Sequence, residues 1–501
     1  MNSFLKTDFP AHKIKPVLVL LLLGLGLIQL GIPLANHYYL RTYAFDYTAY
    51  NFAFYDYAHF RISPCPIYLF PYAVTFLQDH FSITLMLFAP LYWLLGWLTG
   101  TYTLLIIQWA IVLMGARFTY KLILLKTDDN HLSLMGALYY FLLLGRYTFA
   151  AGDCNLAVMG SAFLPVFLYY FEKEKTTATV ICFLLLIFNR EDYALWLIFI
   201  CGFLMILHRA DKPKLKRATL LLVLSILFFF IIFQCIIPAL EDEHKKYTLF
   251  NFAVLGKTPG EALAFVLQHP IQAFKLLYTN HSGSNYYDGI KQEFYWVYFL
   301  SGGFLLLYRP LFLIPFIPII AKKMYNDDPL RWSMESFYSI EIVSLLPVLA
   351  FFIIAGLRSE TLKVTMAWLL CGCALVVTGF ELTKPAPYHK GLLGDTRKSN
   401  FLDSTFYASD YNVKEINKAM KLIPDTAAVS ASGKISQHLA YRKKIYYFPR
   451  IDDAQYVFVI KNNDTWPISK ERIDTLINEL HTRRDFEMLL DKPDFWLLRK
   501  R

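Results

Sequence analysis

Long apolar stretches follow one another along the chain up to residue 381, and a segment of mixed polar and apolar residues comes after them. A helix needs roughly 20 apolar residues to cross a bilayer, so such stretches are typical of membrane-spanning helices. Their hydropathy and spacing predict about eleven spans. We expect them at 17–35, 102–120, 132–149, 156–170, 177–188, 193–207, 218–237, 295–308, 311–320, 342–356 and 362–380. The pattern thus divides the chain into a transmembrane domain, 1–381, and a soluble domain, 382–501.

Basic residues at the ends of the apolar stretches predict how the spans are oriented. Lys13 and Lys15 precede the first span, and the cluster between Arg209 and Arg217 falls on the same side in this count. Loops rich in Lys and Arg stay in the cytoplasm. We therefore expect a cytoplasmic N-terminus and an extracytoplasmic C-terminal domain.

Two segments do not fit a simple count. The stretch 81–97 is apolar enough to cross, but a crossing there would place the later basic clusters outside, so we expect a juxtamembrane or re-entrant helix. The stretch 309–321 is broken by Pro315 and Pro318, and its crossing is left open. If it crosses, three basic residues lie outside against the trend, namely Lys322, Lys323 and Arg331.

The soluble domain has the pattern of a small α/β fold. Helical spacing covers 413–422 and 469–480, and Ser469 is the expected N-cap of the second helix. Short runs of β-branched and aromatic residues predict strands, which we place at 427–431, 444–448 and 456–461.

Composition agrees with a membrane protein. Hydrophobic residues make up 56% of the 501 residues and charged residues only 18%, which is too apolar for a soluble chain of this size. The net charge of +10 is explained by the topology signal, so we expect no nucleic-acid partner. The seven cysteines show no metal-binding spacing. Cys65 and Cys154 both fall outside in this count, and a disulfide between them is left open.

The first outer loop carries two carboxylates in aromatic surroundings. Asp46 and Asp56 lie among tyrosines and phenylalanines between residues 43 and 57. Partial desolvation by such rings raises the pKa of a carboxyl group toward the range in which it can accept a proton from an attacking hydroxyl. The alternative is that the rings form an interfacial belt and the aspartates are only solvated.

Other polar residues in the outer loops suit an anionic ligand. A carboxylate pair beside an arginine can hold a phosphate group, with a divalent cation or the arginine as counter-charge. The same residues also fit tight turns between helices, and a histidine at a helix start is often only a cap. The candidates for substrate binding are Asp56, His80, Arg146, Asp153, Arg190, Glu191 and Asp192.

The order and spacing of several short motifs resemble domain-of-unknown-function family 2079 over nearly the whole chain. The motifs are Phe45-Asp46 with Tyr50-Asn51, His80-Phe81-Ser82, Ala89-Pro90-Leu91-Tyr92, Arg190-Glu191-Asp192, Val429 to Ser432, and His438 to Pro449. That family is similar to the GT-C glycosyltransferases, multi-span enzymes that use a sugar carried on a polyprenyl phosphate. The resemblance implies a mainly α-helical bundle of GT-C type, with Asp46 as catalytic base. It also makes Asp153 a candidate ligand if a divalent cation is used. Glu191, from the carboxylate pair next to Arg190, is the other candidate ligand.

We therefore expect a membrane glycosyltransferase that moves a sugar from a polyprenyl-phosphate carrier to an acceptor on the outer face of the cytoplasmic membrane. The alternative is a non-enzymatic protein, either a flippase or transporter of lipid-linked sugars or a scaffold. A transporter needs ionisable groups near mid-membrane. Apart from Gln108 and Gln234, the predicted spans carry little polarity at that depth, which favours chemistry at the outer face.

Overall fold

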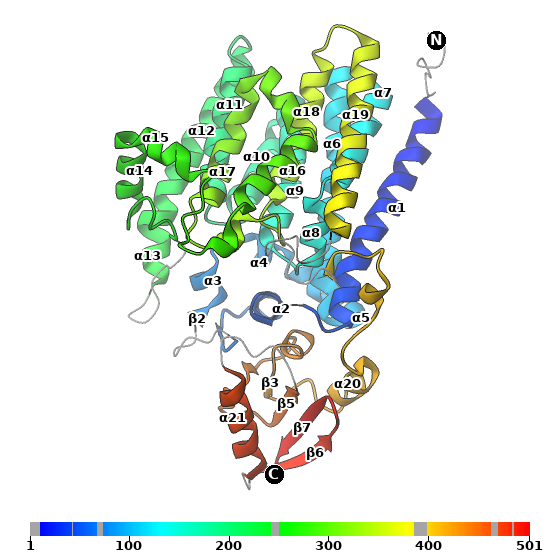
Figure 1. The fold of residues 1–501 in the computed structure, drawn as a ribbon, viewed down its shortest axis with the longest axis vertical. Coiled ribbons are helices and arrows are strands. Elements are labelled where there is room, and N and C mark those ends of the chain that lie inside the picture. Colours follow the sequence, from blue (N-terminus) through cyan, green and yellow to red (C-terminus); the bar gives the residue numbers. More distant parts are fainter. Residues whose placement is uncertain are drawn as a thin grey trace.

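The chain is described by a computed structural model over residues 11–42, 44–67, 74–241, 250–384, 398–461, 469–482 and 485–501. It is mainly helical, and a small sheet lies near the C-terminus. Figure 1 shows a helical bundle with the start of α1 at its upper end and the sheet below its lower end, so α1 begins at the end of the molecule opposite the sheet.

The helices are unequal in length. Their bounds are α1 Ala11–Tyr38, α2 Ala44–Ala58, α3 Phe76–Asp79, α4 Thr84–Phe88, α5 Trp97–Thr99, α6 Thr103–Thr127, α7 Asn130–Leu142, α8 Gly145–Ala151, α9 Leu156–Glu172, α10 Thr176–Ile187, α11 Tyr193–Leu207, α12 Lys212–Ile231, α13 Ile237–Leu240, α14 Pro259–Gln268, α15 Pro270–Leu276, α16 Ile290–Leu300, α17 Ile317–Met324, α18 Ile340–Ala355, α19 Glu360–Thr383, α20 Val413–Met420 and α21 Lys470–Thr482.

Within the described ranges, four helices are long and apolar enough to cross a membrane. They are Pro16–Tyr38, Tyr92–Thr127, Lys212–Leu240 and Glu360–Thr383, and a fifth is obtained if α7 and α8, bent by 44°, count as one span. The protein is therefore a multi-span membrane protein with four or five such helices, and not the expected number of about eleven.

The difference arises because hydropathy does not distinguish burial in lipid from burial in protein. Four further apolar helices, α9, α10, α11 and α18, have only 10–17 residues. At about 1.5 Å per residue, 12 residues reach roughly 18 Å, short of the hydrocarbon core of about 30 Å. α9 is nevertheless almost wholly buried, because it packs between neighbouring helices.

The two doubtful segments are broken in the structure. In 81–97, α4 ends at Phe88 and a π-helical turn, Tyr92–Gly96, leads on toward α6. The stretch 303–316 forms two 3-10 helices, Gly303–Tyr308 and Pro310–Phe316, before α17 begins. Proline lacks a backbone N–H and interrupts an α-helix, which explains the second break.

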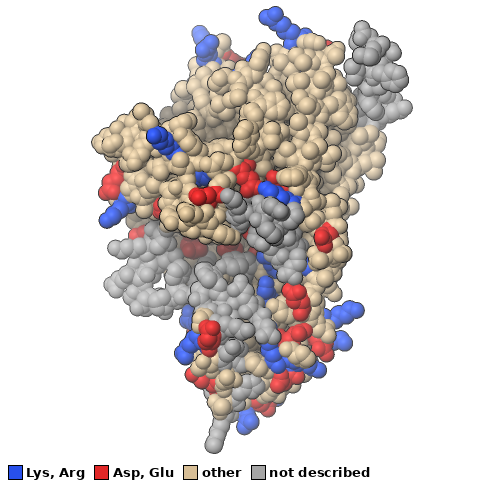
Figure 2. Space-filling model, in the orientation of Figure 1, with Lys and Arg blue, Asp and Glu red and all other residues tan. Residues whose placement is uncertain are grey.

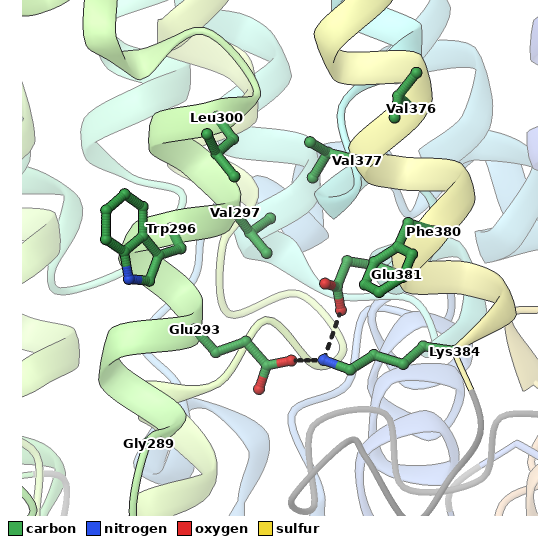
Figure 3. Close-up of a pocket in the computed structure, with 10 residues that line it drawn as sticks. All are labelled: Gly289, Glu293, Trp296, Val297, Leu300, Val376, Val377, Phe380, Glu381 and Lys384. Atoms are coloured by element: carbon green, nitrogen blue, oxygen red, sulfur yellow. Dashed lines mark hydrogen bonds and ion pairs between the residues drawn. The ribbon is translucent and has the colours of Figure 1, made fainter.

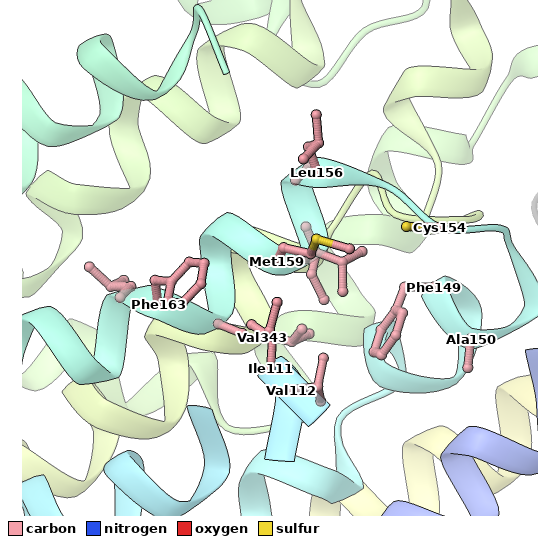
Figure 4. Packing of buried hydrophobic residues seen from close by; sticks show 14 of the residues in the cluster. Ile111, Val112, Phe149, Ala150, Cys154, Leu156, Met159, Phe163 and Val343 are labelled. Atoms are coloured by element: carbon pink, nitrogen blue, oxygen red, sulfur yellow. The ribbon is translucent and has the colours of Figure 1, made fainter. Parts of the chain in front are cut away.

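The interior of the bundle is closely packed. Figure 4 shows Ile111 of α6, Phe149 of α8, Met159 of α9 and Val343 of α18 converging on one another. A Cβ atom at Gly115 would lie 2.9 Å from the backbone oxygen of Ala162, so the glycine permits the close approach of α6 to α9. Small residues at such crossings are typical of membrane bundles.

The C-terminal region contains a five-stranded sheet of order β4-β3-β5-β7-β6. β3 pairs in parallel with β4 and β5, whereas β7 pairs antiparallel with β5 and β6. The predicted strands and both predicted helices are confirmed, and Ser469 accepts a hydrogen bond from the N–H of Arg472 at 3.3 Å, as an N-cap does. The strands β6 and β7 were not predicted. Strand bounds are β1 Pro64–Cys65, β2 Val74–Thr75, β3 Val429–Ala431, β4 Ile445–Tyr447, β5 Tyr456–Ile460, β6 Phe486–Asp491 and β7 Phe495–Lys500.

The sheet region packs against α2, which lies between it and the bundle (Figure 1). The hydroxyl oxygens of Thr48 and Ser436 are 2.9 Å apart, and the side-chain amide of Gln437 donates to the backbone oxygen of Thr42 at 3.1 Å. The guanidinium of Arg41 donates to the backbone oxygen of Phe406 at 2.8 Å. The helix that carries Asp46 and the segment before it are thus hydrogen-bonded to the C-terminal region.

Charge is distributed unevenly over the surface. Figure 2 shows a face on which the bundle carries few Lys, Arg, Asp or Glu, whereas charges gather at its ends, at its junction with the C-terminal region, and over that region. An apolar belt bounded by charges is typical of a protein surrounded by lipid.

Candidate functional site

Asp46 lies in the first turn of α2 and is half-buried. The pKa of its carboxyl group is raised to about 6, chiefly by burial and next by the nearby carboxylate of Asp79, while Arg331 and Arg190 act in the opposite sense. A carboxyl group whose pKa is influenced by two arginines and a second carboxylate lies in a charged region and not in open solvent. We call this region the polar cluster; it consists of Asp46, Asp79, His80, Arg190, Glu191, Asp192, Lys322 and Arg331.

Asp79 and His80 enter the cluster from α3. A capping box fixes the start of this short helix, with Thr75 and Gln78 each accepting a hydrogen bond from the other's backbone N–H. His80 Nε2 lies 3.6 Å from Asp79 Oδ2. Burial lowers the pKa of His80 to about 4, and the two arginines of the cluster contribute, so its imidazole is neutral at pH 7. Its Nδ1 is buried and makes no hydrogen bond within the described part of the chain.

The turn between α10 and α11 supplies the central arginine. Arg190 Nε lies 3.3 Å from Asp192 Oδ1, and Lys322 Nζ lies 2.8 Å from Asp192 Oδ2. Burial alone would raise the pKa of Asp192, but Arg190 and Lys322 outweigh it and hold that pKa below its usual range. Lys322 also lies 2.8 Å from Glu341 Oε1 at the start of α18. This network fixes the direction of the arginine.

Glu191 behaves differently from its neighbour. Burial raises the pKa of its carboxyl group to about 7, and Asp192 contributes to the increase. One of its carboxylate oxygens, Oε2, makes no hydrogen bond within the described ranges. Glu191 is therefore the carboxyl group of this turn that changes its protonation state near neutral pH.

Arg331 enters the cluster from the segment that follows α17, and the ammonium group of Lys323 holds this segment. Lys323 is buried and donates to the backbone oxygens of Arg331 at 2.7 Å, Tyr338 at 3.2 Å, and Ser333. The Arg331 guanidinium lies 5.2 Å from the ring centre of Tyr338. A backbone tied at three carbonyl groups presents its arginine in a fixed position.

The sequence alone did not identify Asp79, Lys322 or Arg331 as members of the site. A signal was present, because Lys322 and Arg331 were the basic residues that broke the topology count. In the structure they lie at the same end of the bundle as Asp46, where they balance buried carboxylates. Because Lys322 and Arg331 interact with carboxylates of the protein itself, their positive charges need not indicate a cytoplasmic loop.

Comparison with known proteins places the chain in a family. The family described as "Predicted membrane protein (DUF2079)" matches residues 36–492. The chain belongs to this family. The match covers the helices from α2 onward, the polar cluster and four of the five strands of the C-terminal sheet, and it leaves out most of α1 and strand β7. A search of curated proteins gives no match.

The other candidate residues of this DUF2079 protein lie outside the polar cluster. Asp56 accepts hydrogen bonds from Arg61 Nε at 2.7 Å and from the N–H of Ser63 at 2.6 Å, so it closes the turn that follows α2. The guanidinium carbon of Arg146 lies 3.5 Å from the ring centre of Tyr140. Arg146 also donates to the hydroxyl of Ser344 on α18 at 2.9 Å.

Asp153 lies in the turn before α9. Gln108 holds this turn by donating to the backbone oxygen of Asp153 at 3.5 Å and accepting from the N–H of Asn155 at 2.8 Å. Asp153 contributes to the raised pKa of Tyr47, so it lies near α2. Cys154 is buried in the same turn, Cys65 is buried elsewhere, and the two do not form a disulfide.

No group of three or more His, Cys, Asp or Glu side chains suited to a metal ion occurs in the ranges that the structure describes. The expectation that Asp153 and Glu191 hold a divalent cation stays a prediction. The positive charge of the polar cluster comes from Arg190, Lys322 and Arg331.

Proposed function

We propose that this protein transfers a sugar from a polyprenyl-phosphate carrier to an acceptor hydroxyl, in the manner of GT-C glycosyltransferases. The observation that carries the proposal is the influence of Arg190 and Arg331 on the half-buried carboxyl group of Asp46. A base and two guanidinium groups at one end of a membrane bundle suit a reaction that removes a proton and releases a phosphate. The polar end of the bundle would then face the outside of the cytoplasmic membrane.

The base in this mechanism is Asp46. The acceptor oxygen attacks the anomeric carbon of the sugar while its proton passes to the Asp46 carboxylate. A pKa of about 6 leaves this carboxylate largely ionised at neutral pH and yet basic enough to accept a proton. The proton then passes to water.

The leaving group is the phosphate of the carrier. The bond between the anomeric carbon and the phosphate oxygen breaks, and its electron pair stays on the phosphate, which departs as polyprenyl phosphate with inversion at the carbon. Arg190 and Arg331 stabilise the developing charge through charge-assisted hydrogen bonds. The neutral imidazole of His80 hydrogen-bonds the donor through the buried Nδ1.

The test is the release of polyprenyl phosphate by the full chain in membranes. Polyprenyl-monophosphate glucose, mannose and arabinose, each radiolabelled in the sugar, serve as donors. Loss of a general base lowers a rate by about 10²- to 10⁴-fold, and we expect this for Asp46→Asn. The matched control is Asp128→Asn at the opposite end of the bundle, where the backbone is left-handed (φ 51°) and tolerates asparagine.

Full transfer by a folded Asp46→Asn variant would show that the base is another group. A wild-type protein that binds the carrier but transfers none of the three sugars to any membrane acceptor would favour the non-enzymatic alternative, a flippase or scaffold.

A further inference from the structure

The turn that follows α2 directs its apolar side chains outward and its polar side chains inward. Phe60 is 98% exposed and Ile62 is 57% exposed. Arg61, between them, donates from Nε to a carboxylate oxygen of Asp56 at 2.7 Å, and the ring of His59 is hydrogen-bonded to a backbone oxygen of α2 at 2.7 Å. In water, large apolar side chains are stabilised by burial and charged ones by exposure. The turn therefore has the arrangement of a surface that lies against an apolar medium.

The backbone of the turn fixes the direction of the Phe60 ring. Phe60 has a φ of 57°, a left-handed conformation that is unusual for a bulky residue. Backbone hydrogen bonds hold this conformation, from the N–H of Phe60 to the oxygen of Tyr57 and from the N–H of Arg61 to the oxygen of Asp56, each at 3.0 Å. Because the ring is almost fully exposed, it takes no part in holding the turn and points away from the protein.

The start of a candidate membrane span lies beside this turn. The span is Tyr92–Thr127, and α6 makes up 25 of its residues. At about 1.5 Å per residue, α6 reaches roughly 37 Å, more than the hydrocarbon core of about 30 Å. Residues 92–99, which precede α6, therefore come at the boundary of this core. Tryptophan is enriched at that boundary. The exposed side chains of this segment are Trp93, Leu94, Trp97 and Leu98.

Two contacts tie the turn to this segment. The indole N–H of Trp93 donates to the backbone oxygen of Ala58 at 2.9 Å, and the rings of His59 and Trp93 are 4.8 Å apart between centres. The π-helical turn that contains Trp93 also packs against α2, and Figure 1 shows α5, which follows it, at the lower end of the bundle. Phe60 comes two residues after Ala58, so it lies at nearly the same depth as the first turn of the span.

Exposed apolar side chains also line a groove between α16 and α19, but their position explains them. Trp296 and Val376 lie on its walls, and Glu293 pairs with Lys384 at its end (Figure 3). α19 is a candidate membrane span, so lipid is expected beside it. The turn 59–62 belongs to no candidate span among the described residues, so its exposed apolar side chains require a separate explanation.

We propose that the turn 59–62 inserts into the bilayer interface beside residues 92–99, so that Phe60 and Trp97 contact lipid at the end of the bundle that carries the polar cluster. The partner is the interfacial region of a bilayer, because the surface continues from a membrane span and consists of aromatic and aliphatic side chains. The turn continues α2, which carries Asp46 in its first turn, so this contact also sets the depth of that helix. It does not require the proposed transfer reaction.

The experiment places the photo-crosslinking residue p-benzoylphenylalanine at one position of the full chain, which is reconstituted in phosphatidylcholine vesicles with radiolabelled acyl chains. In place of Phe60 or Ile62, we expect about tenfold more lipid adduct after irradiation than in place of Leu422, because side chains in the interface reach acyl carbons. Leu422, which is 55% exposed on the C-terminal region, is the matched control. Leu224, which is 42% exposed on the candidate span that contains α12, is the positive control.

A substitution tests whether the turn inserts as a unit. With the crosslinking residue in place of Ile62, Phe60→Asp should lower the yield of lipid adduct several-fold, because a carboxylate remains in water. An unchanged yield would overturn the proposal. So would an adduct at Phe60 no greater than that at Leu422 while Leu224 is labelled, or an adduct at Phe60 with the mass of two chains, which would identify a second copy as the partner.

Discussion

At the scale of single residues, the polar cluster combines carboxyl groups whose pKa values are shifted in different directions by burial and by neighbouring charges. Asp46 and Glu191 have raised pKa values because burial disfavours their charged forms, whereas Asp192 is kept ionised by Arg190 and Lys322. Carboxyl groups with separated pKa values in one site are typical of acid–base chemistry. Asp56, which the sequence places in equally aromatic surroundings, is instead ion-paired with Arg61.

Asp46 should set the acid limb of the pH profile. The base works only when ionised, so the rate of sugar transfer should fall as the pH drops through about 6, well above the ordinary aspartate value of 3.8. Because Arg331 lowers the pKa of Asp46, Arg331→Met should move this limb to higher pH. Because Asp79 raises that pKa, Asp79→Asn should move it to lower pH. Initial rates of sugar transfer, measured from roughly pH 4.5 to 8 for the wild type and both variants, test these shifts of the acid limb.

Arg331→Met and Asp79→Asn serve as controls for each other, because one removes a positive charge and the other a negative charge from the same region. A shift of both limbs in the same direction would contradict the assignment of the limb to Asp46.

At the scale of elements, the segment between α17 and α18 is held in position mainly by hydrogen bonds from a buried ammonium group. Lys323 donates to carbonyl groups of this segment. Lys291 of α16 donates to the backbone oxygens of Leu276 at 2.6 Å and Met324 at 2.7 Å, and so ties α15 to α17. These hydrogen bonds satisfy buried carbonyl groups that regular structure would otherwise pair.

Lys323→Met should destabilise the protein and weaken the site. Methionine has a similar length but leaves buried carbonyl groups unpaired, at about 1–3 kcal/mol for each such group. We expect a lower unfolding temperature and weaker binding of radiolabelled polyprenyl phosphate, because Arg331 is no longer held. Lys216→Met, at an exposed position of α12, is the matched control. Unchanged carrier binding by Lys323→Met would show that Arg331 keeps its position without the lysine.

At the scale of the whole molecule, the C-terminal region supports the helix that carries the proposed base. Phe45, next to Asp46, packs its ring 4.7 Å from that of Tyr447, measured between centres. His37 of α1 stacks on His438 at 3.9 Å. The C-terminal region is therefore part of the architecture of the site.

Arg41→Met should loosen this junction. Arg41 donates to the backbone oxygens of Phe406, Thr405 and Ala408, and methionine cannot replace these hydrogen bonds. We expect faster cleavage between the two regions in limited proteolysis and a several-fold loss of transfer rate. Arg209→Met, an exposed change at the far end of the bundle, should alter neither. Normal proteolytic resistance of Arg41→Met would mean that the sheet contacts alone hold α2.

The side of the membrane on which the site lies can be tested directly. Thr426 is exposed on the C-terminal region. Lys216 is exposed near the start of α12, and this end of the helix lies away from the C-terminal region (Figure 1). If the site faces outward, Thr426→Cys should react with a membrane-impermeant maleimide in intact cells, and Lys216→Cys only after permeabilisation. The reverse pattern would place the site in the cytoplasm.

The sequence by itself determined the class of protein, its mainly helical fold with a small sheet region near the C-terminus, and the Arg190-Glu191-Asp192 turn with Asp46 as residues to examine. These follow from local properties, because hydropathy, strand propensity and capping act over a few neighbouring residues. The strands β6 and β7 escaped prediction because their pairing, with a register shift between Met488 and Leu490, depends on β5 and on each other.

Only the tertiary structure decided how many helices are long enough to span a membrane and which polar side chains lie close together. An apolar helix has the same hydropathy whether lipid or protein surrounds it. The sequence therefore predicted a membrane span at the short helix α9. Asp46 and Arg331 are far apart along the chain, and no local pattern links them. Their proximity depends on the packing of α2, α3, α11 and α17 at one end of the bundle, because electrostatic interactions depend on distance in space and not on separation in sequence.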